Sequence, residues 1–157
     1  MLRVVPAPPA AAPDVQFCGH CGQSPPTPMA ARSRVCALCG LGVVISASAD
    51  VAPKPGDSFV IVDRSLSLCA LSRSAEKLML VDEPDAVHRH ISEFFEPADA
   101  EAGAPDELLR SIIAIAGGHA TAQTIVVRPT GEYGVRFAAR VGPCGPPAGA
   151  LLVLTGL

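Results

Sequence analysis

Periodic apolar segments are concentrated after residue 57 of this 157-residue chain. Residues 58–63 form a β-branched run that predicts a strand, and residues 66–72 alternate apolar and small polar positions, which predicts a second strand. Arg64 and Ser65 provide a short turn, so we expect the two strands to pair as a hairpin. Turns rich in Gly and Pro separate three further predicted strands, at 124–128, 134–141 and 150–155.

Helical patterns fall between these two groups of strands. Ser72 is suited to cap a short helix over residues 73–79. A second helix is predicted from Pro84 to the residue before Pro97, and four residues share its apolar face: Val87, Ile91, Phe94 and Phe95.

A longer helix is predicted to begin near Pro105 and to end at Gly117 and Gly118. Its buried stripe is expected to consist of Leu108, Leu109, Ile112, Ile113 and Ala116. The order of two strands, several helices and three strands predicts an α+β fold, with a five-stranded antiparallel sheet and helices on one face.

Four of the six cysteines occur as two closely spaced pairs, in segments 18–22 (CGHCG) and 36–40 (CALCG). Two residues between paired cysteines let both thiolates reach one ion, and the glycine after each pair permits the required tight turn. Four soft ligands suit a closed tetrahedral zinc site, so we expect one structural Zn²⁺ bound by Cys18, Cys21, Cys36 and Cys39. This region has few apolar residues, and zinc binding, worth about 10–16 kcal/mol in zinc-finger peptides, is expected to stabilise it.

Other roles for this region remain open from the sequence. A pair of redox dithiols is the alternative to zinc, but a redox pair usually stands alone at a strand-to-helix junction. His20 is expected to lie behind the ligands or at the surface, because four thiolates already fill the site. Arg32 and Arg34 lie between the pairs and can reach phosphate, yet no aromatic stacking platform accompanies them, which favours solvated loop arginines.

Composition divides the chain into four regions: an Ala/Pro-rich tail over 1–14, expected to be disordered, a zinc ribbon over 15–48, a linker over 49–56 and a second domain over 57–157. A net charge of −3 argues against a chain built wholly to bind nucleic acid. No apolar stretch reaches the roughly 18–20 residues that cross a bilayer, and prolines interrupt the N-terminus where a secretory signal needs a continuous apolar segment. We therefore expect a cytoplasmic protein without membrane contact, whose cysteines bind metal or stay as thiols.

Three segments of residues 57–157 resemble the PAS sensor family. The opening strand 59–63 (FVIVD) and segment 72–79 (SRSAEKLM) look like the family's D…N-x-x-A-x-x-L-L pattern, with Ser72 at the usual Asn position. Segment 94–99 (FFEPAD) is similar to the family's hydrophobic–hPeD segment. The chain departs from the family at Leu80, where Gly is common, and its last strand lacks the frequent Asp-Ile/Thr ending.

The resemblance implies a domain that senses a ligand, cofactor or partner between sheet and helices and that often dimerises. A ligand groove is expected to be lined by Ile61, Leu68, Ile112 and Val126. The flavin type needs a Gly-x-Asn-Cys-Arg-Phe segment, which this sequence lacks, so no flavin is expected. Haem needs an axial histidine, but the positions of His88, His90 and His119 favour solvent-facing or helix-end roles, so no haem is expected.

The two remaining cysteines have ordinary interpretations: Cys69 is expected to pack in the core and Cys144 to lie in an exposed loop. No catalytic triad, phosphate-binding loop or open metal site emerges, so we expect no enzyme. The main hypothesis is a regulatory protein in which a PAS-like domain binds a ligand or mediates protein interaction and dimerisation, and the ribbon is a contact module. The alternatives are a DNA-binding transcription regulator that uses the ribbon and a thiol-redox sensor.

Overall fold

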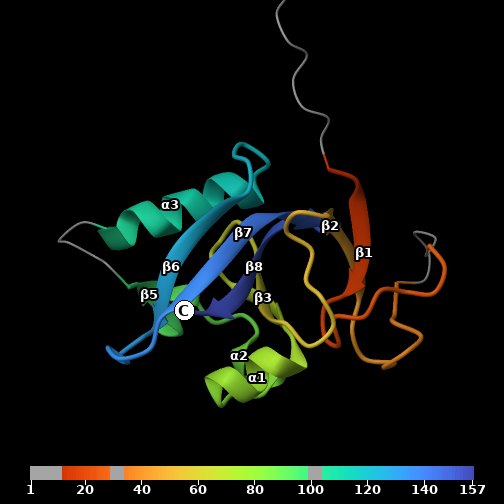
Figure 1. Cartoon of the computed structure of the whole chain (residues 1–157), viewed down its shortest axis with the longest axis horizontal. Helices are drawn as coiled ribbons and strands as arrows, with labels where there is room; N and C mark the ends of the chain where they lie inside the picture. The colour runs from red at the N-terminus through yellow and green to blue at the C-terminus, as the bar shows by residue number, and fades with distance from the viewer. Residues whose placement is uncertain (1–11, 29–33, 99–103) are drawn as a thin grey trace, which may run out of the picture.

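The computed structural model describes residues 12–28, 34–98 and 104–157, which form one curled antiparallel sheet with helices packed against it (Figure 1). The strands run in the order β1-β2-β7-β8-β3-β4, and β6 also pairs with β7 and with β5. Their bounds are β1 Asp14–Cys18, β2 Val44–Ser48, β3 Ser58–Val62, β4 Leu68–Leu71, β5 Phe95–Pro97, β6 Gln123–Pro129, β7 Phe137–Gly145 and β8 Gly149–Gly156. The helices are α1 Arg73–Met79, α2 Glu83–Ala86, the 3₁₀ helix η1 Ile91–Glu93 and α3 Ala104–Ala116.

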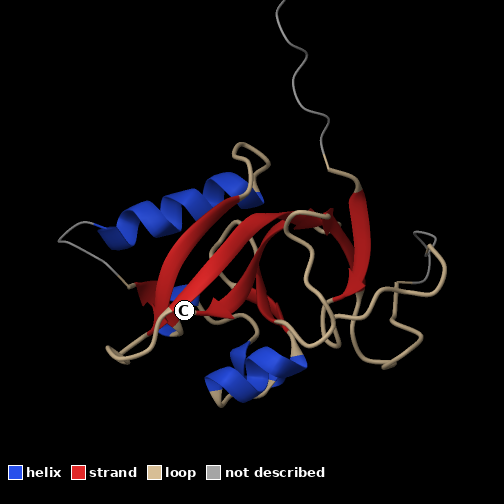
Figure 2. Cartoon of the chain, viewed as in Figure 1, coloured by secondary structure: helices blue, strands red, loops and turns tan. Residues whose placement is uncertain are grey.

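The five strands predicted after residue 57 form the sheet β6-β7-β8-β3-β4, so the α+β prediction is confirmed. Helices α1, α2 and α3, blue in Figure 2, all contribute residues to one apolar core packed against this sheet. Side chains alternate along β3, where Val60 and Val62 belong to that core and Phe59 and Ile61 belong to a second core on the opposite face. Both faces of the central strands are therefore buried.

The prediction of one long second helix between Pro84 and Pro97 is wrong. Helix α2 ends at Ala86, and His88 adopts a left-handed backbone with φ of 71°. The N–H of His88 donates to the carbonyl of Leu68, and the N–H of Leu68 donates to the carbonyl of Arg89, at 2.8 and 2.9 Å. The N–H of His88 and the carbonyl of Arg89 therefore pair with the edge of β4 and are not available for the hydrogen bonds of a continuing helix.

Helix α3 begins and ends close to the predicted residues, but its buried stripe is rotated. Leu108, Ile112 and Ala116 are buried as expected, whereas Ile113 is 42% exposed and Ile115 is fully buried. The stripe therefore follows a regular helical period that runs through Ile115. None of the described helices is long and apolar enough to cross a membrane.

The predictions for Cys69 and Cys144 are both wrong. Between β3 and β4, Ile61 pairs with Ala70 and Val62 pairs with Leu68, so Cys69 is the extra residue of a β-bulge and is exposed. Strand β7 continues through the segment predicted as a Gly/Pro turn, and Cys144 is buried within it. The bulge exposes Cys69, which was expected in the core, and the extension of β7 buries Cys144, which was expected in an exposed loop.

The N-terminal hairpin of β1 and β2 continues the main sheet. Strand β2 pairs with β7 through Ser46 opposite Gly145 and Ala47 opposite Cys144. The side chain of Val51, within the predicted linker, is 1% exposed and packs in the second core. The division into 15–48, 49–56 and 57–157 stays a prediction, and most of the expected tail over 1–14 lies outside the described residues.

Candidate metal centre

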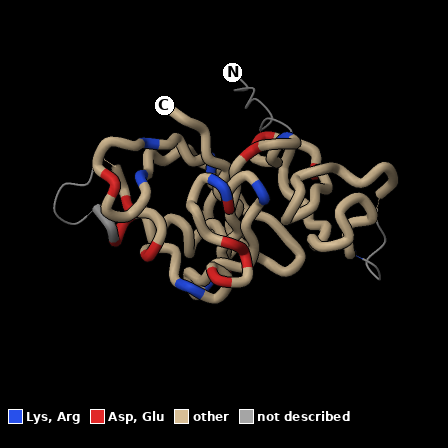
Figure 3. Tube along the Cα trace, turned by 90° about the horizontal axis from the view of Figure 1, so that it is seen from below, with Lys and Arg blue, Asp and Glu red and all other residues tan. Residues whose placement is uncertain are grey.

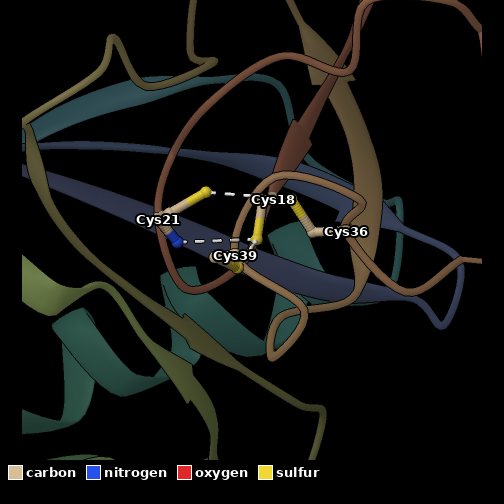
Figure 4. A group of neighbouring side chains, drawn as sticks. All are labelled: Cys18, Cys21, Cys36 and Cys39. Carbon is tan, nitrogen blue, oxygen red and sulfur yellow. Dashed lines mark hydrogen bonds between the residues drawn. The ribbon is translucent and has the colours of Figure 1, made fainter.

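Four thiols converge at one end of the N-terminal hairpin. Cys18 ends β1, Cys21 follows in the next turn, and Cys36 and Cys39 lie in the turn before β2. Figure 4 shows Cys18 and Cys39 between Cys21 on one side and Cys36 on the other. The four sulfur atoms all lie within 4.8 Å of one another. The structure thus brings together the four residues that the sequence predicts as ligands.

The spacing of the sulfur atoms fits a tetrahedral zinc ion. A Zn–S bond of about 2.3 Å places two sulfur atoms of a regular tetrahedron about 3.8 Å apart. The Sγ atoms of Cys18 and Cys39 are 3.7 Å apart, and those of Cys21 and Cys36 are 3.8 Å apart. A disulfide needs an S–S distance of about 2.0 Å, so this arrangement suits metal ligation better than cross-linking.

The backbone folds in the same way around each cysteine pair. The N–H of Gly22 donates to the carbonyl of Cys18 at 3.0 Å, and the N–H of Gly40 donates to the carbonyl of Cys36 at 2.8 Å. Both glycines have positive φ, 72° and 69°, a conformation that side chains disfavour. This repeated turn explains why a glycine follows each pair.

Backbone N–H groups also point at the sulfur atoms. The N–H groups of His20 and Cys21 lie 3.4 and 3.5 Å from Sγ of Cys18, and the N–H of Gly42 lies 3.5 Å from Sγ of Cys39. Such contacts favour thiolate over thiol because they place positive dipoles next to the developing charge.

Burial and these backbone contacts give the thiols of Cys18 and Cys39 different pKa values. Burial raises the pKa of Cys18 to about 12, against the backbone contacts that lower it. Burial also acts to raise the pKa of Cys39, but N–H groups of Gly42 and Leu41 and the neighbouring thiols outweigh it and bring this pKa to about 6. Metal binding must release the protons of the thiols of high pKa, so affinity is expected to fall as pH falls.

His20 lies behind the cysteine cluster and is 8% exposed, so the interpretation as a surface residue is wrong. Its Nδ1 is 3.5 Å from Oε2 of Glu83, and its carbonyl accepts a 2.9 Å hydrogen bond from the N–H of Arg73. Arg34 donates from its guanidinium to the carbonyl of Pro146, while Arg32 lies outside the described residues. These contacts tie the hairpin to α1, α2 and the β7–β8 turn.

Apolar side chains are exposed around the second cysteine pair, a feature that the sequence analysis did not identify. The exposed fractions are 55% for Val35, 58% for Leu38, 72% for Leu41 and 47% for Val43. Within the described part of 15–48, Arg34 is the one Lys, Arg, Asp or Glu, and Figure 3 shows this end of the molecule almost without charged positions. Apolar residues within and just after the second cysteine pair, in a segment with little core to fill, were the available sequence signal.

The expected ligand groove is not assembled as predicted. Leu68 and Ile112 lie in the core beneath the helices, whereas Ile61 belongs to the core on the opposite face of the sheet. Strand alternation separates them, because Ile61 and its neighbours Val60 and Val62 point to opposite faces. The three haem candidates lie outside the buried core: His88 and His119 are exposed, and His90 contacts the hydroxyl of Ser92 at 2.6 Å.

Comparison with known proteins identifies the fold. No protein-family model matches the sequence, and no curated protein matches it. The PAS domain of the RpfR quorum-sensing receptor from Cronobacter turicensis, in complex with BDSF, covers 68% of this chain and 99% of its own, at 13% identity and a TM-score of 0.50.

Two further PAS domains are similar at lower scores. The PAS domain of an HTR-like protein from Haloarcula marismortui covers 64% of this chain and 86% of its own, with 13% identity and a TM-score of 0.47. A PAS domain from Colwellia psychrerythraea covers 65% and 86%, with 13% identity and a TM-score of 0.46. The likeness to the receptor domain, together with the strand order, shows a PAS fold, whose sheet here is extended by a hairpin holding a four-cysteine cluster.

Proposed function

We propose that this protein is a non-enzymatic regulatory protein in which the PAS-like domain senses a ligand or mediates protein interaction and dimerisation. Cys18, Cys21, Cys36 and Cys39 bind one structural Zn²⁺, and the resulting ribbon is the contact module. The observation that supports this most directly is the exposed apolar surface of the second cysteine pair, formed by Val35, Leu38, Leu41 and Val43.

The zinc ion has a structural role in this proposal. Four thiolates occupy all positions of a tetrahedral ion, which leaves none for a substrate or an activated water. The ion instead fixes the turn that presents Leu38 and Leu41 to solvent. A rigid apolar surface loses little conformational entropy on binding, which favours a protein partner or a second copy of the chain.

The sensory role is supported by the kind of proteins that share the fold. The similar structures include the PAS domain of a quorum-sensing receptor in complex with BDSF and the sensor region of a sensor histidine kinase. We extend to this chain only the general role of ligand or partner recognition. The cytoplasmic location and the lack of flavin and haem stay predictions from the sequence.

Native mass spectrometry of the full chain tests the proposal. We expect a mass increase of one zinc per chain and a dimer population that grows with protein concentration. Leu38→Asp should reduce association by at least about tenfold without changing the zinc content, since one charge in an apolar contact costs a few kcal/mol. A chain without zinc, or one that never associates with itself or a partner, contradicts the proposal.

The same protein preparation also tests the two alternative functions, a DNA-binding regulator and a thiol-redox sensor. A DNA-binding regulator requires salt-dependent binding to duplex DNA. The one described cation of the ribbon, Arg34, already donates to the carbonyl of Pro146, which gives this alternative little support. A thiol-redox sensor requires that mild peroxide eject the zinc and change the oligomeric state, so retention of zinc under peroxide removes it.

A further inference from the structure

A cavity of about 430 Å³ lies between the zinc ribbon and the outer face of the PAS sheet. The ribbon forms one wall with Leu41, Val43 and Ile45, and the sheet forms the facing wall with Ile61 and Ala70. Its volume falls in the range of about 300–1,000 Å³ that is typical of small-molecule sites. Ile61 places this wall on the face of the sheet opposite to the helical core, and Glu83, the first residue of α2, lines the cavity as well.

The mouth of this cavity is apolar and accessible. Leu41 is 72% exposed and Val43 is 47% exposed, and both also line the cavity. A molecule entering here covers two side chains that are otherwise in contact with water, which favours binding of an apolar body.

The charged groups that line the cavity, among the described residues, are two carboxylates, Asp63 and Glu83. Oδ1 of Asp63 accepts hydrogen bonds from the N–H groups of Ser65 and Ser67, at 2.7 and 3.0 Å. Oε1 of Glu83 accepts a 3.1 Å hydrogen bond from the N–H of Leu71, and its Oε2 lies 3.5 Å from Nδ1 of His20. These bonds hold both carboxylates in place, so a cation entering the cavity meets charges that are already positioned.

The two thiols in the cavity behave as neutral groups. Burial raises the pKa of Cys144 to about 12. Partial burial and then the carboxylate of Asp63 raise the pKa of Cys69. Neutral thiols are poor nucleophiles and resemble small apolar side chains, so they favour reversible binding over covalent capture.

We propose that this cavity binds a small organic cation with an apolar body, such as a protonated primary amine on an aromatic or aliphatic group. Leu41, Val43, Ile45, Ile61 and Ala70 contact the body, and Asp63 and Glu83 face the cation. The inference rests on the proposed zinc ribbon, because Gly19 and Gly42, next to the zinc ligands, form part of the wall. Binding in the cavity therefore stabilises the zinc-loaded ribbon and, by reciprocity, zinc stabilises the bound cation.

The test uses the full chain after its zinc content has been measured, and three probes with the same phenyl body. These are 2-phenylethylamine, 2-phenylethanol and 3-phenylpropionate, titrated into the protein and followed by NMR. We expect the amine to bind at least about tenfold more tightly than the carboxylate, with the alcohol between them, and to slow zinc transfer to a chelator. Equal affinities of amine and carboxylate, or no binding of the amine to the zinc-loaded chain, overturn the proposal.

Three variants locate the binding site. Ala70→Leu fills the cavity and should abolish binding, while Asp63→Asn keeps an oxygen for the turn but removes the charge and should weaken amine binding about tenfold. Leu41→Ala removes an exposed wall residue without disturbing a core and should weaken all three probes alike. Leu80→Ala is the control, because Leu80 is 92% exposed and lies outside the cavity.

The outcomes separate this inference from the proposed function. A chain without zinc is a failure of the proposed ribbon, whatever the probes do. A chain with one zinc per protein whose amine binding is unchanged in Ala70→Leu and Leu41→Ala retains the ribbon but contradicts the cavity as the binding site.

Discussion

Different interactions stabilise the two ends of the sheet. Beneath the helices, β3, β7 and β8 pack a continuous apolar core that includes Leu68, Ile112 and Leu152. At the tip of the N-terminal hairpin, the buried cluster consists of Cys18, Cys36 and Val44, with Cys21 and Cys39 packed against it. The first region can exclude water by apolar packing alone, whereas the second has little apolar surface to bury.

Between these two regions lies a second apolar core, to which both the hairpin and the sheet contribute residues. Phe17 of the hairpin packs edge-on against Phe59 of β3, with ring centroids 5.6 Å apart. Ile45, Ala47 and Val51 pack in the same cluster. The hairpin thus depends on the thiol cluster at its tip and on the PAS sheet at its base, and substitutions can perturb each of these two supports separately.

The largest effect is expected at the thiol cluster. Cys39→Ser removes one of four proposed ligands and should abolish stoichiometric zinc binding, with loss of most of the roughly 10–16 kcal/mol that such sites supply. Native mass spectrometry should report the missing zinc, and hydrogen exchange should accelerate in β1 and β2 far more than in β8. Cys69→Ser alters an exposed thiol outside the cluster and should retain the zinc. Equal zinc content in both variants would falsify the assignment.

The next largest effect is expected in the core beneath the helices. Ile112 is fully buried, so Ile112→Ala should lower the free energy of unfolding by about 2–5 kcal/mol without loss of zinc. Ile113 follows it in α3 but is 42% exposed, and Ile113→Ala should cost less than about 1 kcal/mol. Denaturant unfolding of both variants checks this pair. Similar losses in the free energy of unfolding would contradict the burial of Ile112 and the exposure of Ile113.

The contrast between the regions also explains which features the sequence could predict. The convergence of the four cysteines depends on local spacing, and the role of Ser72 depends on a local cap, so both could be predicted from short segments. The runs at 59–62 and 150–154 are apolar at every position, which is typical of strands buried on both faces. That pattern is visible in the sequence, but the predicted helices cover one face of the sheet, and no predicted element covers the other face.

The wrong predictions share a different cause. The helix expected up to Pro97 ends at Ala86 because the edge of β4 pairs with residues 88–91, a contact that no local pattern encodes. Cys69 is exposed because a bulge adds one residue to β4, and Cys144 is buried because β7 extends to Gly145, the opposite of the two predictions. A shift of one position reverses the face on which a side chain lies, so strand periodicity alone could not place either thiol.

A smaller effect is expected at Ser72, which connects α1 to β3. Its Oγ accepts from the N–H groups of Ala75 and Phe59, at 3.1 and 3.0 Å, and donates to the carbonyl of Asp57 at 3.1 Å. Ser72→Ala leaves two N–H groups without this acceptor and should destabilise the chain by about 2–4 kcal/mol. Ser74→Ala, in the same helix, is the control, and a similar melting temperature for both variants would show that the cap contributes nothing.

The smallest effect tests how the hairpin is joined to the PAS sheet. A Cβ atom on Gly142 of β7 would lie 2.5 Å from Cγ2 of Val51, in the segment that the sequence suggested as a linker. Val51 is β-branched and 1% exposed, so it has little freedom to move aside. Gly142→Ala should therefore destabilise the chain by about 1–3 kcal/mol through overpacking.

The double variant makes this prediction specific, because Val51→Ala removes both methyl groups that the new Cβ meets. If residues 49–56 are packed on the sheet, Gly142→Ala should cost much less in the Val51→Ala background, where only Cβ of residue 51, 3.1 Å away, remains close, so the two losses should not add. A flexible linker predicts the opposite: Val51→Ala should be nearly neutral, and Gly142→Ala should cost the same with or without it. Denaturant midpoints of the four proteins decide between a ribbon packed on the PAS sheet and one tethered beside it.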